Sequence, residues 1–108
     1  MNTISESVII DGNVALEFVA FNVADMVMGS VVIVPSDSWG TAVFAVKRSP
    51  DGTTVNAQEF SPAKTITSAT DPEHDIDLTG IEWLIVVCTT AEGSALRCHV
   101  HLDAKGCD

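Results

Sequence analysis

The chain has 108 residues, of which 46% are hydrophobic, and fifteen acidic against five basic residues give a formal net charge of −10 at pH 7. This length fits a single domain over residues 1–108, and the apolar fraction is sufficient for a buried core. The excess of negative charge excludes nucleic-acid binding through a basic face, because phosphate groups would be repelled.

No targeting or membrane-spanning segment is indicated. The first ten residues lack the positive start and the long apolar stretch of a secretory signal. The longest strongly apolar runs, Val31–Val34 and Leu84–Cys88, have four and five residues and are too short to cross a bilayer. Three cysteines without CxxC spacing, at 88, 98 and 107, favour free thiols in a reducing compartment.

Alternation of apolar and polar residues with period two dominates the first part of the chain. Residues 8–10 form a short predicted strand, and Asp11-Gly12-Asn13 is typical of a turn. Residues 14–21 then predict one long strand, with Leu16 and Phe18 on the same face. Both faces of this strand carry apolar side chains, so we do not expect it to be cleanly half exposed.

The middle of the chain continues in the same way. Residues 23–28 would allow one helical turn, and no other window suggests a helix. Val31–Val34 is a predicted strand that ends at Pro35, which cannot donate to a sheet ladder. Residues 41–48 form the next strand, and residues 55–60 are expected to pair back onto it.

The turn between these two strands has a clear chemical basis. In Ser49-Pro50-Asp51-Gly52, proline restricts φ at the first central position and glycine accepts a positive φ. Residues 71–80, rich in acids and containing a proline, are interpreted as a loop. Several short strands at this spacing predict an all-β fold, a small antiparallel β-sandwich or barrel.

A hairpin is expected at the C-terminal end, between residues 81–90 and 95–102. A register that pairs Cys88 with Cys98 places two apolar faces towards the core. The core-facing residues of this arrangement are Leu84, Val86, Cys88, Leu96, Cys98, Val100 and Leu102.

The opposite face of this hairpin is the candidate protein-contact face. Its members combine aliphatic, aromatic and basic side chains: Ile81, Trp83, Ile85, Val87, Arg97, His99 and His101. This composition is too apolar for open water and too polar for a dry core, which is typical of a surface that packs against another layer or subunit. The alternative is that a loop of the same chain covers it.

Two groups of residues are candidate metal ligands, and neither has a strong motif. His99 and His101 point the same way in a strand, so both would be available to bind Zn²⁺ or Ni²⁺ with Cys107 or His74 as a third ligand. The carboxylates of Asp71, Glu73, Asp75 and Asp77 would suit Ca²⁺, but they lack the ligand order of an EF-hand. We therefore expect no metal and no cofactor.

No catalytic arrangement is indicated. Cys88 and Cys98 lie in apolar strand runs on the expected core face, where thiols are inert. No serine stands in a GxSxG context. The sequence therefore predicts a protein that is not an enzyme.

The order of motifs from residue 39 onwards resembles small β-sandwich virion proteins of tailed bacteriophages, over roughly residues 30–104. In these proteins a strand ends in a Ser-x-Asp-Gly turn, and an Asp-x-Thr-Gly segment leads into a strand with an aromatic residue near its start. The matching residues are Ser49, Asp51 and Gly52, followed by Asp77, Thr79, Gly80 and Trp83. The chain departs from the pattern in its cysteines and in the His-x-His of its last strand.

The resemblance implies a structural role in the virion, as a capsid decoration (cement) protein, a head-fibre base, or a connector or tail component. Partners would be further copies of the chain and a major capsid or other virion protein, assembled in the host cytoplasm as a homo-oligomer. The alternative is a β-sandwich module that binds carbohydrate or another surface, with Trp39 or Trp83 as a stacking platform.

Overall fold

The computed structural model describes residues 2–106 and contains eight β-strands in that range. No helix is present among these residues, so none there is suited to crossing a membrane. The strands are β1 (Thr3–Asp11), β2 (Phe18–Asn22), β3 (Met26–Pro35), β4 (Val43–Ser49), β5 (Gln58–Ile66), β6 (Glu73–Asp77), β7 (Trp83–Thr90) and β8 (Arg97–Gly106).

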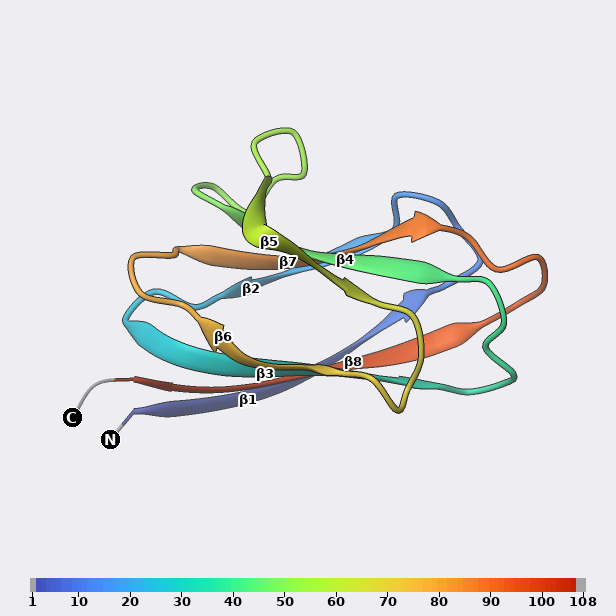
Figure 1. The fold of residues 1–108 in the computed structure, drawn as a ribbon, viewed down its shortest axis with the longest axis horizontal. Helices are drawn as coiled ribbons and strands as arrows, with labels where there is room; N and C mark the ends of the chain where they lie inside the picture. The colour runs from blue at the N-terminus through green and yellow to red at the C-terminus, as the bar shows by residue number, and fades with distance from the viewer. Residues whose placement is uncertain (1, 107–108) are drawn as a thin grey trace.

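The strands form two four-stranded sheets that face each other as a sandwich (Figure 1). One sheet has the order β1-β8-β3-β6, the other has the order β2-β7-β4-β5, and all pairs are antiparallel. Within the described chain only β4 and β5 are paired neighbours in sequence, because every other connection crosses to the opposite sheet. This order is that of the double-sheet jelly roll. The expected all-β antiparallel sandwich is therefore confirmed.

The core lies between the two sheets and is formed by the alternate residues that point inwards. Phe44 of β4 and Ile33 of β3 are fully buried there, and Trp39 packs edge-on against Phe44 with ring centroids 5.4 Å apart. Burying each such large apolar side chain contributes about 1.5–3 kcal/mol to folding. The inward faces expected for the last two strands are also correct, since all their members are buried.

The expected pairing of these two strands is wrong. β7 pairs with β2 and β4, whereas β8 pairs with β1 and β3 in the other sheet. Both strands still direct their apolar faces to one core, because they approach it from opposite sides. Glu92, in the connection between them, accepts hydrogen bonds from the backbone N–H groups of Gly40, Thr41 and Ala42 at 2.9, 3.0 and 3.1 Å. These bonds anchor the crossing between the sheets.

Three local expectations are also corrected. The segment 23–28 has no helical turn, since β3 begins at Met26 after a bend in which Asp25 has a φ of 70°. The loop expected at 71–80 contains β6, which adds an edge strand beside β3. The long strand expected at 14–21 begins only at Phe18, because Leu16 has a φ of 69°, outside the extended range of a regular strand.

The turn after β4 is formed as expected. The Ser49 hydroxyl accepts a hydrogen bond from the N–H of Gly52 at 3.1 Å, and Gly52 has a φ of 79°. The Asp51 carboxylate accepts bonds from the hydroxyl and N–H of Thr53 and from the side-chain amide of Asn56, which lower its pKa. The connection between β4 and β5 rises above the sheet that contains β7 (Figure 1).

Candidate protein-contact surfaces

The residues of the expected contact face are divided between the two sheets. Trp83, Ile85 and Val87 alternate along β7 and point away from the core on the outer side of the β2-β7-β4-β5 sheet. The other strand of the expected face, β8, lies in the opposite sheet. Its three members, Arg97, His99 and His101, point outwards from that sheet. Ile81 belongs to neither surface, because it is buried in the main core.

The apolar residues of β7 are covered by the same chain. Ile85 is fully buried and Val87 is 4% exposed, in a small cluster with Ala45, against which Ala20 and Ala57 pack. Ala57 belongs to the connection between β4 and β5, so this connection acts as a cover over the outer side of the sheet. The alternative left open by the sequence, a loop of the same chain over this face, therefore holds for Ile85 and Val87.

The two tryptophans are both half-buried against their own chain. The Trp83 ring lies under the turn after β4, where a Cβ added to Gly52 would be 3.1 Å from its Cδ2 atom. The Trp39 Nε1–H donates a hydrogen bond to the carbonyl oxygen of Ala42 at 2.7 Å. These contacts give each ring a structural role in holding a loop to the sandwich.

A different apolar surface remains open at the edge of this cover. We define the Leu16 patch as Leu16, Phe18 and Val55, which are 73%, 42% and 89% exposed. Leu16 and Val55 line a shallow hollow of about 210 Å³ together with Val87, and Phe18 is paired with Val87 across the ladder between β2 and β7. The patch thus joins the start of β2 to the loop after β4.

The backbone of Leu16 is held in a left-handed conformation, with a φ of 69°. For a residue with a Cβ this conformation costs about 1–2 kcal/mol. Two backbone hydrogen bonds maintain it, from the N–H of Leu16 to the carbonyl oxygen of Cys88 and from the N–H of Cys88 to that of Glu17, both at 2.8 Å. The consequence is a leucine that projects into solvent. Apolar periodicity alone did not indicate this feature.

The outer side of the β1-β8-β3-β6 sheet presents a mixed surface. His99 and His101 are half-buried, and their rings are stacked with centroids 6.2 Å apart and an interplanar angle of 14°. His99 lies between Ile9 of β1 and Val34 of β3 in the ladders. Ile9 and Val34 are 52% and 45% exposed, so this row combines imidazole and aliphatic side chains at the surface.

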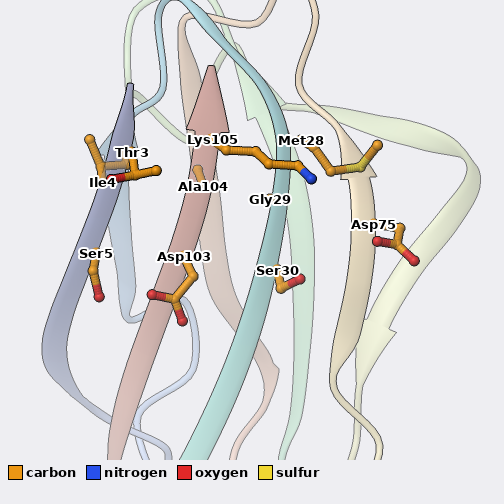
Figure 2. Close-up of a pocket in the computed structure, with 10 residues that line it drawn as sticks. All are labelled: Thr3, Ile4, Ser5, Met28, Gly29, Ser30, Asp75, Asp103, Ala104 and Lys105. Atoms are coloured by element: carbon orange, nitrogen blue, oxygen red, sulfur yellow. The ribbon is translucent and has the colours of Figure 1, made fainter. Parts of the chain in front are cut away.

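Further along the same side, a polar hollow of about 390 Å³ lies over the ends of β1, β8 and β3 (Figure 2). Ser5, Asp103 and Ser30 project from these three neighbouring strands to the same side, and the Lys105 side chain reaches across β3 towards Met28. Hydroxyl, carboxylate and ammonium groups therefore line this hollow.

The expected metal ligands are not brought together in the described part of the chain. Between residues 2 and 106, no three His, Cys, Asp or Glu side chains lie where they would hold one metal ion. In the acidic segment, Asp77 accepts a hydrogen bond from the N–H of Thr79 at 3.0 Å, which lowers its pKa. Asp71, Glu73, His74 and Asp75 lie in or just before β6. Cys107 lies outside the described residues.

Cys88 and Cys98 are both fully buried and free of disulfides. Burial raises the pKa of the Cys98 thiol to about 11, with smaller contributions from Cys88, Asp11 and Glu92. Burial also raises the pKa of Cys88. Both side chains are therefore neutral thiols at physiological pH, which is the protonation state expected for core cysteines.

These features define the class of the protein: residues 2–106 form an eight-stranded jelly-roll β-sandwich with exposed apolar and mixed surfaces on the outer sides of its two sheets. Comparisons with protein-family models, with curated proteins and with solved structures found no match for the chain.

Proposed function

We propose that this protein is a non-enzymatic structural component of a bacteriophage virion, a capsid decoration or head–tail accessory protein that packs in multiple copies. The resemblance of its two turn motifs to phage virion proteins supports this role. The fold is compatible with it, because jelly rolls occur in viral capsid domains as well as in lectins and cupins. A fold hosts many functions, so the argument depends on the surface.

The observation that carries the proposal is the Leu16 patch. A leucine that is 73% exposed is held at a φ of 69°, although glycine or asparagine would adopt this backbone more easily. Backbone strain that exposes a large apolar side chain is typical of a residue that serves in binding. The free energy of burying apolar surface offsets this strain when another virion protein covers Leu16, Phe18 and Val55.

The charge of the chain suits a virion protein as the partner. A net charge of −10 disfavours contact with packaged nucleic acid and keeps the free protein soluble before assembly. Lys47 lines the hollow next to Leu16 and Val55, so a partner surface with apolar residues and carboxylates complements this site. Many copies placed on one lattice compensate for a small contact area in each.

The proposal is tested on purified phage particles. The protein should co-sediment with purified particles in multiple copies, and particles assembled without it should take up the added wild-type protein. The Leu16→Asn variant should lose at least about tenfold in affinity, because asparagine tolerates the backbone but removes the apolar side chain. Val34→Thr, on the opposite sheet, is the matched control and should bind normally. Absence of the protein from purified particles would contradict the proposal.

The polar hollow in Figure 2 favours a second candidate, a module that binds carbohydrate. Ser5, Ser30 and Asp103 would supply hydroxyl and carboxylate partners for a sugar. Against this, neither tryptophan lines the hollow. A glycan array with wild type and Asp103→Asn decides between the candidates: a glycan signal that Asp103→Asn abolishes would favour the module.

A further inference from the structure

The four edge strands of the sandwich differ in how well they resist pairing with another strand. β2 and β6 have only five residues each, and β6 contains Asp75 with a φ of 55°. β5 is interrupted by a bulge opposite Val46 and Lys47 and contains Pro62, which has no N–H to donate. Short length, bulges and proline are among the features by which proteins protect sheet edges.

β1 has none of these three features, and the one charge within it on the core-facing side is Glu6. Its nine residues pair with β8 in an unbroken register from Thr3 to Asp11, without bulge or proline. Seven of the nine residues are exposed, among them Val8 at 38% and Ile9 at 52%. An edge strand of this length presents a row of unpaired backbone groups to solvent, together with apolar side chains on both of its sides.

We propose that β1 is a self-association edge, which pairs antiparallel with β1 of a second copy around a two-fold axis at Ser7. In this register all nine residues of each strand overlap. Ser7 lies opposite its own counterpart, Ser5 opposite Ile9 of the partner, and Glu6 opposite Val8 of the partner. The two four-stranded sheets then become one continuous eight-stranded sheet, and Val8 and Ile9 lose exposed area.

The charges of the strand disfavour the register centred one residue earlier, on Glu6. Centring the axis on Glu6 would set two carboxylates directly opposite each other, which is destabilising. Centring it on Ser7 places no acid opposite an acid. Asp11 comes to lie opposite the partner's Thr3, which is itself paired with Lys105.

Basic residues are scarce in this chain but are present here. Of the five, Arg97 and Lys105 both stand on β8, directly beside the two ends of β1. In the paired sheet Asp11 lies between its own Arg97 and the partner's Lys105, two strand spacings or about 10 Å from the latter. The Lys105 side chain, which lies across β3 in Figure 2, would have to turn towards β1, and its flexible stem and the aspartate side chain would then together span this distance. A molecule with a net charge of −10 therefore offers both signs of charge at this edge.

This contact joins two copies of the chain and does not involve the Leu16 patch. Its failure would therefore leave the proposed virion role unaffected, and a failure of that role would leave this contact unaffected.

Sedimentation across micromolar to millimolar concentrations tests the proposal. Wild type should reach twice the monomer mass of 11.4 kDa. Ser7→Lys places two ammonium groups together at the axis and should raise the dimer Kd by about fivefold. Ser7→Thr, which is neutral and suits a strand, should dimerise like wild type. A wild type that stays at 11.4 kDa throughout, or a Ser7→Lys variant that dimerises equally well, would overturn the proposal.

Cross-linking tests the register without disturbing the edge. In a Cys107→Ser background the remaining cysteines, Cys88 and Cys98, are buried. Ser7→Cys should then form a covalent dimer with a short bis-maleimide, because the two Cβ atoms would be about 5 Å apart. The exposed Ser94, in the connection before β8, is the control, and Ser94→Cys should give little dimer. Equal cross-linking of both variants would overturn the two-fold register.

Discussion

The Oε1 atom of Glu92 accepts a hydrogen bond from the backbone N–H of Ala42 at 3.1 Å and so joins the connection between β7 and β8 to the start of β4. The same carboxylate accepts bonds from Gly40 and Thr41, and the N–H of Glu92 donates to the carbonyl oxygen of Gly12 at 2.8 Å. Three loops at one end of the sandwich are thus held together by one residue. A jelly roll depends on such contacts because most of its connections pass from sheet to sheet.

The first prediction concerns the pH dependence of this contact. Hydrogen bonds from Ala42, Thr41 and Gly40 hold the pKa of Glu92 below its ordinary value of 4.5. A lowered pKa contributes stability that is complete above pH 4.5 and is lost as pH falls through the lower value in the folded protein. The Tm of wild type should therefore fall more steeply below this pH than that of Glu92→Gln.

The control for this measurement is Glu59→Gln, which removes an exposed carboxylate on β5. Its Tm should follow the wild-type slope. Asp51 and Asp77 also have lowered pKa values. They therefore also lower the Tm in acid, and they are present in wild type, Glu92→Gln and Glu59→Gln alike. Parallel curves for wild type and Glu92→Gln in thermal melts between pH 3 and 7 would contradict the assignment.

The second prediction compares two phenylalanines. Phe44 is fully buried between the sheets, whereas Phe18 is 42% exposed on the outer side. Phe44→Ala should lower the free energy of unfolding by about 3–5 kcal/mol, because it removes core contacts and leaves a cavity. Phe18→Ala should lower it by no more than about 1 kcal/mol. Urea titrations measure both, and equal losses would show that the inner and outer faces of β2 or β4 are misassigned.

The third prediction compares two glycines with nearly the same backbone. Gly52 and Gly80 have φ angles of 79° and 77°, so a Cβ strains each by about 1–2 kcal/mol. Only at Gly52 would it also press on the Trp83 ring, at 3.1 Å, since nothing lies within 4 Å of the corresponding position at Gly80. Gly52→Ala should therefore lose more stability than Gly80→Ala and also change the tryptophan fluorescence. Equal effects of the two changes would mean that the turn does not press on Trp83.

The fourth prediction concerns the backbone of Leu16. Leu16→Asn should leave the free energy of unfolding unchanged or raise it by up to about 1 kcal/mol, because asparagine accepts the left-handed conformation and little buried area is lost. Val14→Asn is the control, since Val14 is also exposed, at 45%, but is not among the residues with a positive φ. Val14→Asn should not raise the free energy of unfolding. A loss of more than about 1 kcal/mol in Leu16→Asn would show that the leucine serves the fold and is not held there for binding.

The fifth prediction concerns the buried thiols. In a Cys107→Ser background, neither Cys88 nor Cys98 should react with a thiol reagent at pH 8 within the time in which a free peptide thiol reacts fully. Burial keeps both protonated, with the pKa of Cys98 at about 11. Full reaction should follow on addition of urea. Rapid labelling of the native protein would contradict their place in the core.

The alternation of apolar residues was sufficient to predict which side chains of the last two strands face the core between the sheets. Leu84, Val86 and Cys88 point inwards as expected, and so do Cys98 and Val100. The Asp51-Gly52 turn was predictable for the same reason, because a positive φ and a side-chain acceptor are local requirements. The apolar side of a strand and the residues that a turn requires are properties of a few neighbouring positions, so the sequence alone determines them.

The choice of partner strand was decided only by the tertiary structure. Alternation says which side of a strand is apolar and does not say which strand lies beside it, so β7 and β8 were equally consistent with a hairpin and with two opposed sheets. The cover over Ile85 and the left-handed backbone of Leu16 have the same origin. The first depends on Ala57 in a loop after β4, and the second on a hydrogen bond to Cys88, far along the chain. Such contacts form only when distant segments meet, because the free energy that maintains them comes from the assembled sandwich and not from local preference.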